Sequence, residues 1–150
     1  MLMPVLFHAL QLGRVFMPMY LPLVALAFFT HPGAAALTAL LVPLLSGFVT
    51  GMPPFMPPVA FIMSVELALM AALIGALGAV FPRMPAWARL AVALAFGRVV
   101  YVALAYAAAR ALDLPAGFVA GISLLSGWPG IVLMMLAIPA LVRIMKGKTT

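Results

Sequence analysis

Long apolar runs, separated by prolines, glycines and isolated charges, follow one another along this sequence and constrain its fold more than any other feature. Apolar residue types make up 68% of the chain and charged types only 7%, whereas soluble domains are about 45–50% apolar and about 25% charged. A soluble domain of 150 residues leaves too much surface in water to hide so many apolar side chains. The sequence therefore predicts an integral membrane protein surrounded by lipid.

The apolar runs have the lengths of membrane-spanning helices. A helix needs roughly 20 apolar residues to cross the hydrocarbon core, and strand-type alternation, which a lipid barrel would need, is absent. Division at the helix breakers predicts these spans: Val15 to Thr30, Ala34 to Thr50, Val59 to Phe81, Ala86 to Leu112 and Pro129 to Met145.

The segments between these spans read as turns, apart from a short N-terminal stretch. Met1 to Leu12 is apolar but too short to cross, His31–Pro32–Gly33 reads as a turn, and the proline-rich Gly51 to Pro58 cannot be regular helix. We expect a single all-α membrane domain over residues 1–150. We expect this domain to be a bundle of five to six transmembrane helices with a shortened first helix, followed by a short basic cytoplasmic tail at residues 146–150.

Basic residues set the expected orientation. They gather in the loop that holds Arg83 and Arg89 and in the C-terminal tail, and positively charged loops face the cytoplasm. This places the loop around Met52 and the turn at Asp113 outside, and the C-terminus inside. The formal net charge of +6 comes mostly from basic residues that separate the apolar runs. The sequence has no basic patch with interleaved aromatic residues, so nucleic-acid binding is not indicated.

Two charges fall inside predicted spans. Glu66 and Arg98 lie on consecutive antiparallel spans near the middle of the membrane, where a lone charge costs at least about 2.5–3.5 kcal/mol. They should therefore pair or line a wet cavity. Two interpretations stay open, a ligand site or a structural ion pair that locks two helices, and both can hold at once. Tyr101 follows Arg98 on the same helix face and joins the candidate site.

Further candidate binding residues lie toward the expected outer face. His8 and Arg14 flank the first external turn, where either could contact an anionic or heteroaromatic solute. Ser126 and Trp128 precede Pro129, so a broken segment and a helix start with free N–H groups lie there. The alternative is that the histidine is an ordinary solvated residue and that the tryptophan is an interface anchor.

Catalytic and metal-binding patterns are absent from the sequence. There is no metalloprotease motif, phosphate-binding loop or nucleophile elbow. With only two acidic residues, two histidines and no cysteine, the chain offers few ligands for a metal. We expect no enzyme activity, no cofactor and no metal site, and the chain has no means of using ATP itself.

Several proline- and glycine-containing motifs are familiar in their order and spacing. They are Phe16 to Pro22, Pro43 to Pro54, Met63 to Leu67, Gly97 to Tyr101 and Gly127 to Leu133. Together they resemble the substrate-binding S component of energy-coupling factor (ECF) transporters, over roughly residues 8–145. Tyr20, within the first motif, completes the set of candidate binding residues. The family's first helix spans fully, whereas Met1 to Leu12 does not, which is why we expect a shortened one.

The resemblance implies a function that the residues alone do not. S components bind vitamins or related micronutrients near the outer face of a prokaryotic cell membrane. They deliver the solute through a separate transmembrane coupling protein that carries a pair of ABC ATPases. On this basis we expect a solute-binding, multi-pass subunit of an importer, with lipid, coupling protein and ATPases as partners. The alternative is a non-transport scaffold or assembly protein in which Glu66 and Arg98 form a structural pair.

Overall fold

A computed structural model of the chain describes residues 20–113, apart from residues 52, 54 and 57, and residues 128–147. Within these ranges every regular element is a helix and no strand occurs. The helices are α3 (Tyr20–Leu26), α4 (Pro32–Thr50), α5 (Val59–Val80), α6 (Ala86–Ala111) and α8 (Trp128–Gly147). The all-helical class expected from the sequence is confirmed for this part of the chain.

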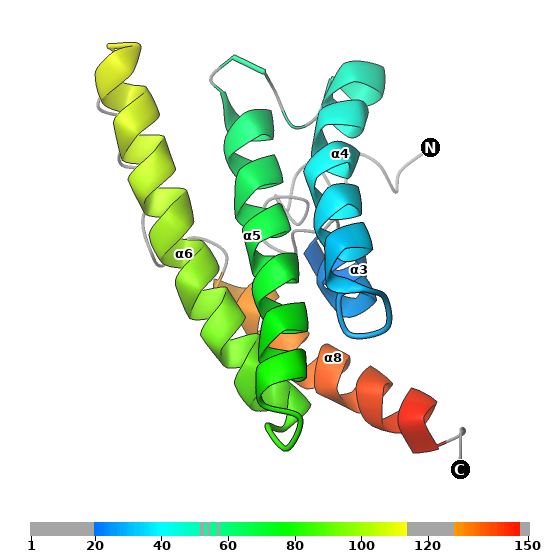
Figure 1. Ribbon diagram of the computed structural model, residues 1–150. Helices are drawn as coiled ribbons and strands as arrows, with labels where there is room; N and C mark the ends of the chain where they lie inside the picture. Colours follow the sequence, from blue (N-terminus) through cyan, green and yellow to red (C-terminus); the bar gives the residue numbers. More distant parts are fainter. Residues whose placement is uncertain (1–19, 52, 54, 57, 114–127, 148–150) are drawn as a thin grey trace.

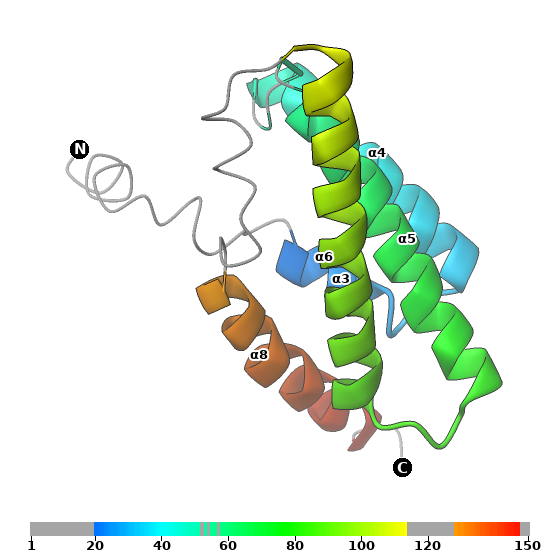
Figure 2. The ribbon, with the colours of Figure 1, turned by 90° about the vertical axis from the view of Figure 1, so that its left-hand side faces the viewer.

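The arrangement centres on α5. Figure 1 shows α5 between α4 and α6, and the two turns of α3 beside α4. Helix α8 contacts α6 and α3, and the view in Figure 2 shows α8 on the far side of α3 from α4. The short helix α3 thus lies against α4, α5 and α8, and its residues Tyr20, Leu23 and Val24 are buried.

Three helices are long and apolar enough to cross a membrane, namely α4, α5 and α6. They match three of the predicted spans to within two residues at each end. The apolar part of α8 is shorter, from Gly130 to Met145. A bundle of five to six spans is therefore not established by the described residues, and the stretch Met1 to Leu12 lies outside them.

The predicted span Val15 to Thr30 is wrong beyond Leu26. The helix gives way there to tighter turns, in which the N–H groups of Phe28 and Phe29 donate to the carbonyl oxygens three residues earlier, at 3.0 Å each. The hydroxyl of Thr30 also donates to the carbonyl oxygen of Leu26, at 2.9 Å. These bonds satisfy carbonyl groups at the end of α3 and turn the chain toward α4.

The expected turn at His31–Pro32–Gly33 is also wrong, because α4 begins there. His31 caps the helix: its ring Nδ1 accepts a hydrogen bond from the backbone N–H of Gly33 at 3.3 Å. Pro32 occupies the first helical position, where its missing N–H removes no helical hydrogen bond and its fixed φ suits the helix. Pro32 and Gly33, interpreted from the sequence as helix-breaking residues, instead form the first turn of α4.

The other end of α4 runs into the proline-rich loop, which is non-helical at its described residues, as predicted. Gly51 ends the helix with φ 73° and donates its N–H to the carbonyl oxygen of Gly47 at 3.0 Å. This left-handed conformation is one that glycine adopts without a side-chain clash. The loop then folds back: a Cβ on Gly47 would lie 2.7 Å from the carbonyl oxygen of Pro53 and 3.2 Å from the ring of Phe55.

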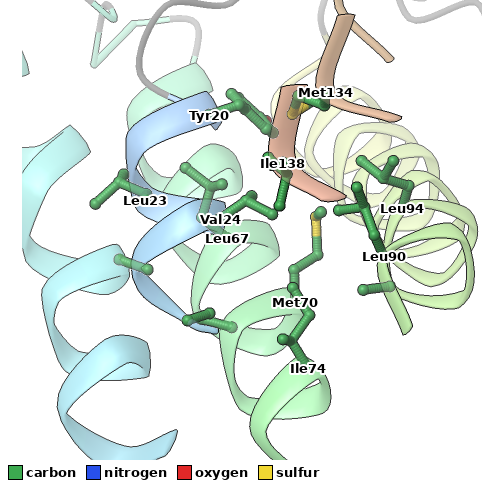
Figure 3. Packing of buried hydrophobic residues seen from close by; sticks show 14 of the residues in the cluster. Tyr20, Leu23, Val24, Leu67, Met70, Ile74, Leu90, Leu94, Met134 and Ile138 are labelled. Atoms are coloured by element: carbon green, nitrogen blue, oxygen red, sulfur yellow. The ribbon is translucent and has the colours of Figure 1, made fainter. Parts of the chain in front are cut away.

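The buried core lies where α3, α5, α6 and α8 meet. Figure 3 shows Val24, Met70, Leu90 and Ile138 converging from these four helices. Large apolar side chains also cover the outside of the helices, as Phe48, with 85% of its surface exposed, illustrates. Such extensive apolar exposure is rare on soluble monomers and suits lipid contact.

Candidate functional site

The interior of the bundle holds one buried acid among the described residues. Glu66 lies on α5 and is 2% exposed, and its Oε2 accepts a hydrogen bond from the hydroxyl of Tyr20, the first residue of α3. A buried carboxylate is costly unless donors surround it, and a buried tyrosine hydroxyl needs a partner as well. The bond therefore satisfies both groups and ties α3 to α5.

The other oxygen of Glu66 faces α6 at Gly97. A Cβ built on Gly97 would lie 3.4 Å from Glu66 Oε1, 2.7 Å from Cγ of Met70 and closer still to Met70 Sδ. The absence of a side chain at this position thus lets two α5 side chains lie directly against the backbone of α6. Gly97 immediately precedes Arg98, so the close approach brings Glu66 of α5 near the turn of α6 that carries Arg98.

Arg98 lies near the middle of α6 and is partly buried. Its guanidinium carbon is 5.9 Å from the centroid of the Tyr101 ring, one turn further along the same helix. A cation held over an aromatic face at this distance is stabilised electrostatically, more strongly where water is excluded. Tyr101 in turn packs against a second small cluster formed around Ile62 and Ala105, which fixes the position of its ring.

A small cavity lies between these side chains. Its volume is about 10 Å³, which is close to the smallest space that holds one water molecule. Three polar and four apolar side chains line it: Tyr20, Glu66, Arg98, Met70, Leu94, Ile131 and Met134. The walls come from α3, α5, α6 and α8, so groups far apart in the sequence meet at one place.

The structure brings together part of the set predicted from the sequence. Tyr20, Glu66 and Arg98 line the cavity, and Tyr101 lies beside it through its contact with Arg98. His8, Arg14 and Ser126 lie outside the described residues. Trp128 begins α8, but its side chain also lies outside what the structure describes.

Two residues of the apolar lining, Met70 and Leu94, were not singled out by sequence reasoning. Met70 and Leu94 belong to runs of similar apolar residues, and nothing in the sequence distinguishes the residues that face the cavity from those that face lipid. Only one sequence feature pointed to Gly97 as part of the site, namely its position next to Arg98, a charged residue inside a predicted span. The described residues hold no group of three or more histidine, cysteine, aspartate or glutamate side chains that could bind a metal ion.

Comparisons of the chain with protein-family models, with curated proteins and with solved structures gave no match. The class of the protein therefore rests on its own residues. Its described part is an all-helical protein with three helices long and apolar enough to cross a membrane. Two side chains of opposite formal charge, Glu66 and Arg98, line one small cavity between α3, α5, α6 and α8.

Proposed function

We propose that this chain is the solute-binding S component of an ECF-type importer, which captures a vitamin-like micronutrient at the outer face of a prokaryotic cell membrane. The observation that carries the proposal is the cavity that Tyr20, Glu66 and Arg98 line between α3, α5, α6 and α8, in which α5 and α6 are long and apolar enough to cross a membrane. Charged side chains within membrane-spanning helices are rare, and they usually mark a substrate or ion pathway. The motif resemblance supports the same function.

The lining residues suit capture of a small molecule. Glu66 accepts hydrogen bonds, Arg98 donates them, and Tyr20 holds the carboxylate in place. The remaining wall is apolar, which is the usual composition of a small-molecule site. Met70 and Met134 are unbranched and adaptable, so a solute larger than one water can enter when their side chains move aside.

Transport itself requires other proteins under this proposal. The sequence contains no phosphate-binding loop, so the energy must come from separate ATPases that act through a transmembrane coupling protein. The chain recognises the solute, and its C-terminus lies in the cytoplasm according to the distribution of basic residues.

A structural role is the second candidate, and one observation favours it. The Glu66 carboxylate already accepts the Tyr20 hydroxyl, and the cavity has room for about one water molecule. In that case the polar cluster locks α3, α5 and α6 together in a membrane scaffold. The two candidates differ in what the protein carries when it is isolated.

Gentle purification from native membranes separates these candidates. An S component brings down ATPase subunits or a bound small molecule, detected by mass spectrometry, and supports uptake only when the coupling module is present. A scaffold brings down neither. Recovery of the chain with other membrane proteins alone, without ATPases or a small molecule, contradicts the transport proposal.

A further inference from the structure

The formal charges of the described side chains that line the cavity sum to zero. Glu66 contributes one negative charge and Arg98 one positive charge, and the other five described lining residues are tyrosine, methionine, leucine and isoleucine side chains, which are neutral. Asp113, the second acid of the chain, lies beyond the end of α6 and does not line the cavity. The described wall is therefore dipolar, with no net charge.

The two charges belong to different walls. Glu66 extends from α5 toward the α6 backbone, with Oε2 bonded to Tyr20 and Oε1 facing Gly97. A carboxylate accepts more than one hydrogen bond on each oxygen, whereas a guanidinium only donates. Arg98 extends from α6 and is held against the Tyr101 ring. A molecule between them meets an acceptor on one side and a donor on the other.

Because the cavity lies in apolar surroundings, the net charge of a ligand strongly affects its binding. Four apolar side chains complete the wall, and both charges lie in helices that lipid surrounds, so water screens them weakly. A ligand that carries a net charge would leave one charge uncompensated in this environment, which is strongly unfavourable. A neutral ligand with one donor and one acceptor keeps the charges balanced and pairs with both walls.

We infer that the site selects a small solute of zero net charge, either neutral or zwitterionic, whose hydrogen-bond donor faces Glu66 and whose acceptor faces Arg98. Amides, lactams and zwitterions of small rings belong to this class, whereas phosphates, simple carboxylates, amines and metal ions do not. The inference rests on the proposed function and narrows it, because it names the charge class of the solute.

Matched probes of one ring size test this selection. Nicotinamide, nicotinate and the corresponding aminomethylpyridine share a pyridine ring and differ in their charge near neutral pH. Their dissociation constants are measured by calorimetry on the purified chain in lipid nanodiscs. We expect nicotinamide to bind at least about tenfold more tightly than either charged probe, since only the latter leave a charge uncompensated. Glu66→Gln should shift the preference to nicotinate, and Arg98→Gln should shift it to the amine.

Tighter binding of a charged probe by the unaltered chain overturns the inference, as does a ranking that neither substitution changes. If a variant does not fold, the ranking on the unaltered chain decides alone. If no probe binds, native mass spectrometry identifies the solute that the chain carries from the membrane, and a net-charged solute overturns the inference while a neutral or zwitterionic one supports it. If the chain binds no probe and carries no solute, the proposed function itself is wrong.

Discussion

Replacing Tyr20 with phenylalanine removes one hydroxyl group and leaves the ring, so it tests the bond between α3 and Glu66 with little change in packing. Tyr20 is 5% exposed and Glu66 is 2% exposed, so water cannot readily replace the lost donor. A hydrogen bond to a charged group contributes about 1.5–3 kcal/mol, whereas polar bonds between membrane helices average about 0.6 kcal/mol. We expect Tyr20→Phe to lower the free energy of unfolding by about 1–3 kcal/mol, because the buried oxygen of Glu66 loses its donor.

The same substitution at Tyr106 provides the control. Tyr106 is 50% exposed, and its hydroxyl accepts from Arg110 Nε at 3.1 Å and Nη2 at 2.8 Å. Tyr106 lies near the end of α6, where interfacial water can replace the bond, so Tyr106→Phe should change stability by less than about 0.5 kcal/mol. Reversible unfolding in mixed detergent micelles measures both variants. Equal losses for the two variants would refute the reasoning, and so would a loss at Tyr20 no larger than the average of about 0.6 kcal/mol.

Three further predictions concern packing, orientation and energy supply. Gly75→Ala should destabilise the chain by about 1–3 kcal/mol, because the new Cβ would lie 2.6 Å from Cβ of Pro32 and 3.1 Å from its Cα; Gly33→Ala, whose nearest contact is 3.6 Å away, should be neutral or stabilising in the same unfolding assay. Single cysteines at Arg83 and Asp113 should be labelled from opposite sides of the membrane, with Arg83 cytoplasmic, and labelling from one side would contradict the orientation. ATP-driven uptake into liposomes should require added coupling protein and ATPases, and uptake by this chain alone would contradict the proposal.

The long helices were predictable because their signals are local. Val59 to Val80 and Ala86 to Ala111 are continuous apolar runs with breakers at both ends, and lipid favours such runs as helices whatever their neighbours. The error at Pro32 arose because proline ends a helix in one position and begins it in another. The choice depends on the capping side chain of His31, whose ring accepts the hydrogen bond from the following turn.

The polar part of the site was predictable for a different reason. A charge inside a span is so costly that Glu66 and Arg98 each needed a partner or a cavity. In the structure both side chains line the same cavity, one from α5 and one from α6. The apolar part could not be predicted, because the inner and outer faces of a membrane helix are equally apolar. Only tertiary packing distinguishes Met70, 1% exposed, from Leu69, 42% exposed.

Native mass spectrometry of the chain purified in a mild detergent tests the central claim most directly. The unaltered chain should carry a bound small molecule, seen as a discrete mass increase, and the double variant Glu66→Leu with Arg98→Leu should fold without it, because both charges are removed together and neither is left unpaired. A small molecule retained by the folded double variant, or none on the unaltered chain, would contradict a solute site at Glu66 and Arg98.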